Sequence, residues 1–205
     1  SFKHTNPAGV SIERTLTPLE REVNFVTDND MKTLSKTAQA YILARGVDPK
    51  SSFGDFVAIS GHVDISLANR LRSEVSDGII AQSFSNAALD VLKQKKNGKY
   101  VILQGRPIPS SYKETRTFGN FGLVQDNNDE KTTETLILKA NHSAAKPCSF
   151  NTQDLLDMQI ANIVVKYAQS NAVSLVKNGT LLGVGVGQQS RIDCVGLACG
   201  KALVN

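Results

Sequence analysis

Short apolar segments of strand length alternate with helix-like segments along this 205-residue chain. Residues 78–81 and 100–103 form continuous apolar runs of the kind that a buried strand shows, and residues 66–76 and 85–96 have the composition of helices. Buried strands that alternate with helices are typical of an α/β fold with a largely parallel sheet. We therefore predict a layered α/β domain.

Other segments extend this pattern toward both ends of the chain. Thr17, Pro18 and Glu20 stand where the N-cap, the first residue and the third residue of a helix favour those types. A helix is predicted over 30–45, because its apolar residues have helical spacing and Gly46 follows it. The remaining predictions are a loop that runs into a strand over 51–59, strands over 135–139, 173–176 and 181–186, helices over 152–169 and from about Gln188, and polar, turn-rich segments over 104–116 and 125–133 that flank 117–124.

Composition narrows the class of partner. Twenty-three Lys and Arg against 19 Asp and Glu give a formal charge of +4, and the basic residues are scattered apart from a group at 93–99. Scattered charge of this size fits anionic small molecules rather than nucleic acid. The ordinary hydrophobic fraction of 40% excludes a disordered or collagen-like chain, and no apolar run reaches the roughly 18 residues of a membrane helix.

The cysteines and the start of the chain suggest a compartment and a length. The cysteines at 148, 194 and 199 form an odd, loosely spaced set, which favours reduced thiols in the cytosol. No basic and apolar leader precedes the first motif, so we expect a cytoplasmic protein without a membrane partner. Because the chain begins at Ser1 inside a dense motif and without methionine, we also expect it to be a fragment of a longer protein.

Lys3 and His4 are the first candidates for chemistry. Neighbouring residues on a strand point to opposite faces, so a bulge or turn is needed to re-aim one of these side chains. His4 could then accept a proton near neutral pH, and Lys3 could stabilise developing negative charge. The residues that follow, 6–9, have the composition of a turn. The alternative is a surface lysine beside a histidine at a strand end.

A glycine-rich segment, Gly183-Val-Gly185-Val-Gly187, leads from a predicted strand into a predicted helix. Glycines at such a junction can let backbone amides approach an anion. The spacing matches neither the dinucleotide fingerprint nor the P-loop. The alternative is a strand packed closely against a neighbouring element, and the residues alone leave both interpretations open. Arg191 is the better candidate for binding, because a guanidinium can hold a carboxylate or phosphate through two hydrogen bonds.

A third pattern faintly resembles the motifs of zinc deaminases. It consists of His62-Val63-Asp64 and Pro147-Cys148. The similarity fails on chemistry, because an Asp replaces the longer Glu and Asn151 stands where a second cysteine is needed. The other two cysteines are also too far apart in the sequence to complete the pattern. Since a catalytic zinc ion needs three well-placed protein ligands, we predict no metal site.

Seven segments cover most of the chain in a fixed order. They are Ser-Phe-Lys-His-x-x-Pro-Ala-Gly at 1–9, Ala-Arg-Gly-x-Asp at 44–48, Ser-Ser-Phe-Gly-Asp-Phe-Val-Ala at 51–58, Glu-Val-Ser-Asp-Gly-Ile-Ile-Ala at 74–81, Lys-Lys-Asn-Gly at 95–98, Val-Lys-Tyr-x-Gln-Ser-Asn at 165–171 and Gly-Gln-Gln-Ser-Arg-Ile at 187–192. In this order they resemble the eukaryotic-type 5-aminoimidazole-4-carboxamide ribonucleotide (AICAR) formyltransferases. In that family, the formyltransferase is the C-terminal part of a bifunctional purine enzyme that also has inosine monophosphate (IMP) cyclohydrolase activity. Residues 104–150 match poorly, apart from Arg-Thr-Phe-Gly at 116–119.

The resemblance implies a more specific fold than the residue pattern does. The formyltransferase region of this family consists of two cytidine-deaminase-like subdomains without the zinc of true deaminases. Each has three α/β/α layers and a mixed, largely parallel sheet. Residues 1–205 are therefore expected to be the first of these subdomains, with the cyclohydrolase domain and the second subdomain outside the chain.

The resemblance also assigns roles to residues on the nucleotide side. His4 matches the proposed general base, which takes a proton from the 5-amino group of the nucleotide and contacts it. Lys3 matches the neighbouring residue that stabilises the transition state. Gly54, Asp77 and Asn171 match positions that contact the nucleotide. The implied catalytic residues are thus His4 and Lys3.

Arg191 and Ile192 match the folate side, where an arginine suits the anionic tail of the co-substrate 10-formyltetrahydrofolate. The implied reaction moves its formyl group to the 5-amino group of AICAR, giving formyl-AICAR (FAICAR) and tetrahydrofolate in de novo IMP biosynthesis. The implied partners are a small-molecule nucleotide and a folate, with a homodimer in the full-length enzyme. A site that draws on both subdomains would be incomplete in this fragment. The competing hypothesis is a non-catalytic nucleotide-binding or dimerisation fragment of the same family.

Overall fold

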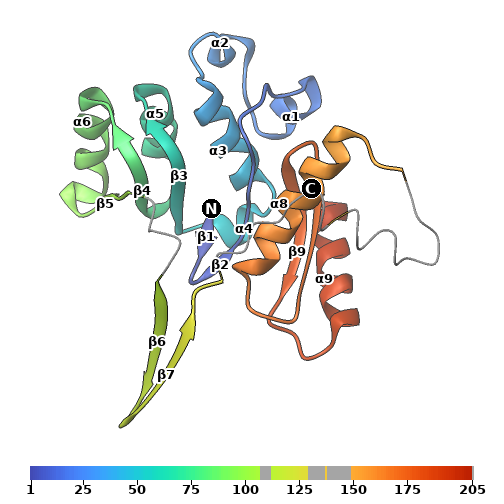
Figure 1. Cartoon of the computed structure of the whole chain (residues 1–205). Helices are drawn as coiled ribbons and strands as arrows, with labels where there is room; N and C mark the ends of the chain where they lie inside the picture. The colour runs from blue at the N-terminus through green and yellow to red at the C-terminus, as the bar shows by residue number, and fades with distance from the viewer. Residues whose placement is uncertain (107–111, 129–136, 138–148, 205) are drawn as a thin grey trace.

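The computed structural model describes residues 1–106, 112–128, 137 and 149–204. Its largest sheet has five strands in the order β2-β1-β3-β4-β5 (Figure 1). The last three of these strands are parallel, whereas β1 runs antiparallel to both of its neighbours. The strands are β1 (Phe2–Lys3), β2 (Asn6–Pro7), β3 (Asp55–Val63), β4 (Ser76–Phe84) and β5 (Val101–Gln104).

Three helices share one apolar core with this sheet. They are α3 (Lys36–Gly46), α5 (Ile65–Ser73) and α6 (Asn86–Gln94). Helix α5 connects β3 to β4 and α6 connects β4 to β5, as βαβ units require, whereas α3 precedes β3. Val57 of β3 and Ile79 of β4 meet Leu67, Leu71 and other wholly buried side chains in this core. Shorter elements complete the region, namely α1 (Pro18–Val23), α2 (Asp28–Met31), α4 (Pro49–Ser52) and a 3-10 turn η1 (Lys95–Gly98).

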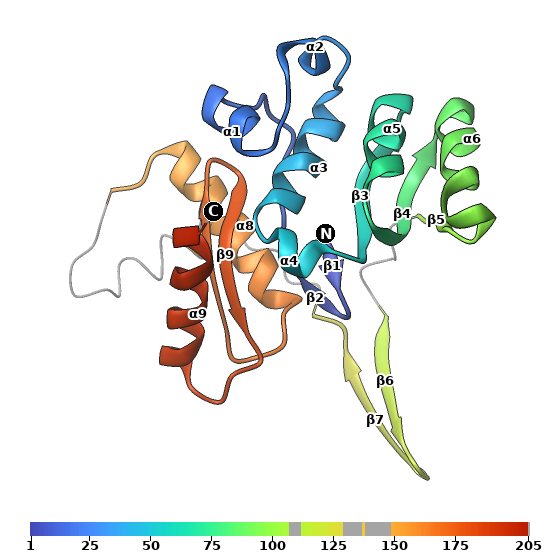
Figure 2. The same cartoon turned by 180° about the vertical axis from the view of Figure 1, so that it is seen from behind.

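A second layered unit lies on the other side of α3 (Figures 1 and 2). Its strands β8 (Ala172–Lys177) and β9 (Thr180–Val186) form an antiparallel hairpin between helices α8 (Thr152–Lys166) and α9 (Arg191–Val204). Apolar side chains of the hairpin pack on α8. Toward α9 the hairpin presents glycines, and a Cβ on Gly183 would lie 2.1 Å from the carbonyl oxygen of Ala198. The glycines therefore permit close packing of strand and helix.

The glycine-rich segment thus follows the second of its two interpretations over most of its length. Gly185, like Gly183, faces α9, and a Cβ there would lie 2.1 Å from the carbonyl oxygen of Cys194. These two glycines serve contact between main chains and do not form an open anion-binding loop. Gly187, with φ +67°, ends the strand and turns the chain toward Arg191.

The structure changes the interpretation of the middle of the chain. The flanks of 117–124 were expected to be polar and turn-rich, but β6 (Lys113–Phe118) and β7 (Phe121–Asp126) form an antiparallel hairpin that protrudes from the body (Figure 1). Its turn is Gly119-Asn120, with Gly119 at φ +57°, as the first residue of a tight hairpin turn requires. Polar residues on both strands are compatible with a two-stranded ribbon whose faces are both exposed. The strand predicted over 135–139 lies, apart from residue 137, outside the described residues.

Several other boundaries shift for local reasons. The helix predicted over 30–45 is two helices, α2 and α3, because the side chain of Ser35 accepts a hydrogen bond from the Ala38 amide and starts α3. The predicted start at Thr17 is confirmed, with reciprocal hydrogen bonds between Thr17 and Glu20. The predicted α/β class with a mixed, mostly parallel central sheet is confirmed. None of the helices in the described parts of the chain is both long and apolar enough to cross a membrane.

The contact between β9 and α9 predicts opposite effects for two glycine substitutions. We expect Gly183→Ala to lower the free energy of unfolding by about 1–3 kcal/mol, because main-chain atoms of α9 would have to move. Gly200→Ala, on the exposed side of the same helix with no atom within 4 Å of the added Cβ, should raise it by about 0.5–1 kcal/mol. Urea denaturation measures both. Equal effects of the two substitutions would contradict the close packing.

Candidate functional site

The N-terminal hairpin orients Lys3 and His4 differently. Lys3 pairs with Asn6 across the antiparallel β1–β2 ladder, so His4 and Thr5 form a two-residue turn between the strands. His4 has φ +55° and is exposed. A left-handed conformation is uncommon for residues other than glycine, although histidine adopts it more often than most. This turn supplies the change of direction that the adjacent Lys-His pair required.

Lys3 lies against the chain that enters β3. Its Nζ donates hydrogen bonds to the carbonyl oxygens of Phe53 (2.5 Å) and Gly54 (3.3 Å). Gly54 has φ +72°, a conformation that an L-residue with a side chain rarely adopts. The ammonium group of Lys3 is therefore held at the amino-terminal end of β3.

Asp77 stands next to this position on the parallel strand β4. The Gly54 amide donates to the carbonyl oxygen of Val75 at 2.9 Å. This hydrogen bond joins the places where the chain enters β3 and β4, which we call the entrances of these strands. A Cβ on Gly54 would lie 3.3 Å from Lys3 Nζ and 3.8 Å from Asp77 Oδ2. The structure therefore brings Lys3, Gly54 and Asp77 together. They lie at the edge of the sheet where the parallel strands β3 and β4 begin, opposite to the edge where open α/β sheets usually bind ligands.

The carboxylate of Asp77 is paired with Lys96. The hydrogen bond from Lys96 lowers the pKa of Asp77 below its usual value, and the positive charges of Lys96 and Lys3 lower it further. Its side chain is 61% exposed, so water screens these charges. Two lysines, Lys96 and Lys3, thus act on this one carboxylate.

Lys96 reaches Asp77 from an unusual loop. Lys96, Asn97 and Gly98 have consecutive φ values of 51°, 55° and 82°. Asn and Gly adopt this conformation readily, but for a lysine it costs about 1–2 kcal/mol. An exposed ion pair contributes about 0–1 kcal/mol. The ion pair therefore does not by itself account for the conformation of Lys96.

A second group of predicted residues lies around Asn171. Its Nδ2 donates to the carbonyl oxygens of Gln188 (3.0 Å) and Gln189 (2.9 Å), which lie three and two residues before the start of α9. Arg191 and Ile192 are the first two residues of that helix, and both are exposed. The structure thus places Asn171, which the resemblance predicts to contact the nucleotide, beside the segment that leads to Arg191 and Ile192. The resemblance predicts that these two residues bind the folate.

The two groups are joined through the N-terminal hairpin. Asn6 Oδ1 accepts a hydrogen bond of 2.8 Å from the backbone N–H of Gln169. Asn6 belongs to β2, beside the turn that contains His4, and Gln169 is two residues from Asn171. The hairpin therefore contacts the Gly54 region through Lys3 and the 169–171 segment through Asn6.

A buried ion-pair network adjoins the group formed by Lys3, Gly54 and Asp77. Asp55, which follows Gly54, is completely buried and lies 3.1 Å from Arg45 Nη1. Arg45 also donates to the carbonyl oxygens of Ser52 (2.8 Å) and Val75 (3.2 Å), and its Nε lies 2.9 Å from a carboxylate oxygen of Glu74. Both strand entrances are thus attached to one guanidinium.

The sequence contained a signal for this network that we did not use. Arg45 and Asp55 belong to two of the segments that resemble the formyltransferases, but neither was given a role. Charged residues inside otherwise apolar segments are rarely buried unless they are paired, so their pairing could have been considered. Tyr41 adjoins the same network, and burial, followed by the charge of Asp55, raises its pKa far above the usual value.

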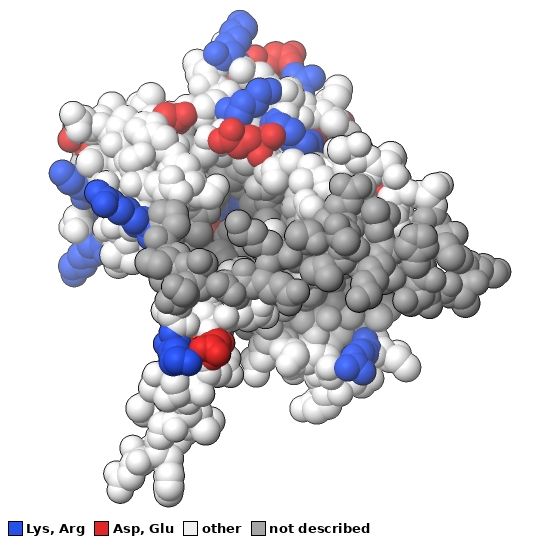
Figure 3. Space-filling model, in the orientation of Figure 1, with Lys and Arg blue, Asp and Glu red and all other residues white. Residues whose placement is uncertain are grey.

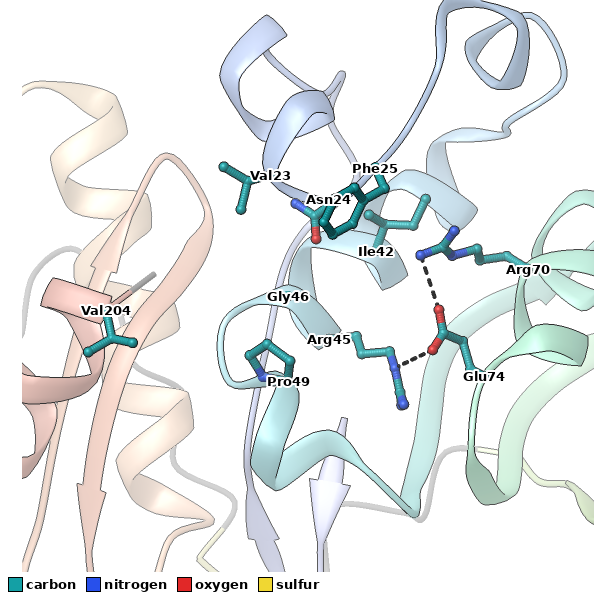
Figure 4. A pocket seen from close by; sticks show the side chains of 10 residues that line it. All are labelled: Val23, Asn24, Phe25, Ile42, Arg45, Gly46, Pro49, Arg70, Glu74 and Val204. Carbon is teal, nitrogen blue, oxygen red and sulfur yellow. Dashed lines mark ion pairs between the residues drawn. The ribbon is translucent and has the colours of Figure 1, made fainter.

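A cavity of about 440 Å³ opens on the outer side of this network (Figure 4). Arg70 and Arg45 both pair with Glu74 at its wall, and the apolar side chains of Phe25, Val23 and others complete it. None of the residues predicted from the sequence to bind nucleotide or folate lines this cavity. It is therefore separate from the candidate site.

The surface charge and the positions of possible metal ligands were compared with the sequence-based predictions. Basic and acidic side chains are interspersed on the face shown in Figure 3, without a continuous basic surface among the described residues. No group of three His, Cys, Asp or Glu in the described part of the chain could hold a metal ion. His62 Nδ1 lies 2.9 Å from Ser83 Oγ, Cys194 is buried, and Cys148 falls outside the described residues.

The network predicts a large effect of removing Arg45. Arg45→Met should lower the free energy of unfolding by about 3–5 kcal/mol, because it leaves the buried carboxylate of Asp55 without its partner. The matched control is Arg72→Met, at an exposed position of α5, for which we expect a change within about 0.5 kcal/mol. Chemical denaturation of both variants tests this, and a mild effect at Arg45 would show that the network is dispensable.

Comparison with known proteins adds information independent of this geometry. Residues 1–201 match the family model described as "AICARFT/IMPCHase bienzyme". The chain is 31% identical over 204 residues to the bifunctional purine biosynthesis protein PurH of Desulfitobacterium hafniense, and 31% identical over 205 residues to the PurH of Parvibaculum lavamentivorans. These alignments cover 98% of this chain but 34% and 33% of the relatives. The chain thus spans about a third of the length of the curated relatives it matches.

Proposed function

The chain belongs to the AICARFT/IMPCHase bienzyme family, and we propose that it forms part of the site that transfers a formyl group from 10-formyltetrahydrofolate to the 5-amino group of AICAR. The products are FAICAR and tetrahydrofolate. The observation that supports this proposal most directly is the convergence of Lys3, Gly54 and Asp77 beside the turn that presents His4.

The chemistry needs the residue types that meet there. The amine of AICAR is a weak nucleophile, because its lone pair is delocalised into an imidazole ring that bears a carboxamide. The amine nitrogen attacks the formyl carbon, and His4 accepts the proton that the amine loses. Lys3 stabilises the oxyanion that forms on the formyl oxygen. The bond from the formyl carbon to the folate nitrogen then breaks, and that nitrogen takes up a proton.

The other predicted residues have binding roles in this proposal. Gly54, Asp77 and Asn171 contact the nucleotide, and the absent side chain of Gly54 leaves room beside Asp77. Arg191 and Ile192 bind the folate, with the guanidinium directed to its anionic tail. The exposure of both side chains at the start of α9 is compatible with this role.

The relatives are about three times as long as this chain, and we propose that the complete site needs more of the protein. In this proposal, residues 1–205 are the first of two similar subdomains, a cyclohydrolase domain precedes them, and a homodimer completes the site in the cytoplasm. The 205-residue chain alone should then show little or no formyl transfer. Robust activity of the isolated chain would overturn the shared site.

His4 is the residue whose removal tests the reaction itself. In the full-length protein, His4→Ala should lower turnover by roughly 10²–10⁴, the usual contribution of a positioned base, while nucleotide binding weakens far less. The matched control is His62→Ala, an exposed histidine on β3 whose Nδ1 lies 2.9 Å from Ser83 Oγ. Steady-state kinetics with saturating folate measure the effect. Full turnover in His4→Ala would remove His4 from the mechanism.

Arg191 tests the folate side separately. Arg191→Ala should raise the KM for 10-formyltetrahydrofolate by the loss of one charge-assisted hydrogen bond, about 1.5–3 kcal/mol, with little change in kcat. Arg72→Ala, an exposed arginine on α5, is the control. An unchanged folate KM together with a collapsed kcat would place Arg191 at the reacting centre instead.

A further inference from the structure

The loop that contains Lys96 is part of the candidate site, although the proposed function gives it no role. We propose that Lys96 is a positioning residue that orients the Asp77 carboxylate to accept hydrogen bonds from the nucleotide. This inference rests on the proposed function, because it deepens the description of the nucleotide-binding part of the same site. The inference gives a role to Lys96, which is 19 positions away from Asp77 in the sequence.

The two oxygens of Asp77 are in different surroundings. Oδ1 accepts the hydrogen bond from Lys96 Nζ. Oδ2 is directed toward Gly54, 3.8 Å from the place that a Cβ would occupy, and no described residue donates a hydrogen bond to it. Lys96 thus fixes one oxygen and leaves the other facing the space beside Gly54. A hydroxyl or amide of a nucleoside monophosphate in that space could donate to Oδ2.

The backbone of the loop supports a role beyond stability. Lys96 adopts a left-handed conformation that costs more than an exposed ion pair contributes. Unfavourable conformations of this kind persist where the surrounding structure fixes them, and they cluster at functional sites. In this protein the conformation points Lys96 at Asp77, which is the neighbour of Lys3 and Gly54.

The charges around Asp77 explain why a cation is useful there. Lys96 is the hydrogen-bonded partner and Lys3 is the second cation that acts on this carboxylate. Lys3 is committed to the carbonyl oxygens of Phe53 and Gly54 and, in the proposed mechanism, to the formyl oxygen. A separate cation for Asp77 allows Lys3 to keep that position, because the carboxylate then has its own partner.

Two substitutions of Lys96 separate its charge from its backbone. Lys96→Met removes the ammonium group, and Lys96→Gly removes it while relieving the left-handed conformation. In the full-length protein, both should raise the KM for AICAR about tenfold, as expected when a charge-assisted contact is weakened, and leave kcat within about twofold. Lys96→Arg should restore most of the affinity, and Lys99→Met, on the same loop, should match the wild type. Lys96→Gly should be at least as stable as the wild type in urea, which excludes misfolding as the cause.

A measurement on the 205-residue chain provides a readout that does not depend on activity. Titration of the Asp77 carboxyl carbon by NMR, assigned with Asp77→Asn, should show that Lys96→Met raises the Asp77 pKa and that Lys99→Met does not. An active wild type in which both Lys96 variants keep the wild-type KM overturns this inference alone. An unchanged Asp77 pKa in Lys96→Met also overturns it. A full-length wild type without formyl transfer overturns the proposed function, and the inference with it.

Discussion

The guanidinium of Arg45 is the interaction on which the geometry of the candidate site depends. It binds the carbonyl oxygens of Ser52 and Val75 and pairs with the buried Asp55 and with Glu74, so it attaches the entrance of β3 to the entrance of β4. A buried carboxylate without a partner is costly, so the two entrances cannot separate without a large penalty. Arginine suits this position because its planar group donates in several fixed directions at once. Gly54 and Asp77 are adjacent because these entrances are adjacent.

The apolar pattern was sufficient to predict most of the elements in the core. The strands around Val57 and Ile79 and the helices that carry Leu67 and Leu92 are buried, and burial imposes the periodicity that the sequence shows. The apolar pattern did not predict elements whose position is not determined by the burial of apolar side chains. Ser35 divides a predicted helix through its own hydrogen bond to the backbone, and the exposed β6–β7 hairpin has no buried side chain whose spacing could predict its strands.

The resemblance supplied the residues of the candidate site, and it did not supply the contacts among them. The resemblance identified Lys3, His4, Gly54 and Asp77. The structure brings Lys3, Gly54 and Asp77 together, and His4 lies in the turn that follows Lys3. Contacts such as the hydrogen bond from the Gln169 amide to Asn6 join residues 163 positions apart. Local propensity contains no information on such distant pairs, because they depend on how whole elements pack. For the same reason the pairing of Lys96 with Asp77 could not be predicted.

The backbone conformations around Asp77 connect this packing with the proposed chemistry. Among the described residues, five non-glycine positions have positive φ, and His4 and Lys96 are two of them. Gly54, with φ +72°, lies between Lys3 and Asp77 in the same region. Short turns with fixed, unfavourable dihedral angles hold their side chains more firmly than flexible loops do. In the proposed site, such turns would reduce the reorganisation needed when the two substrates are positioned.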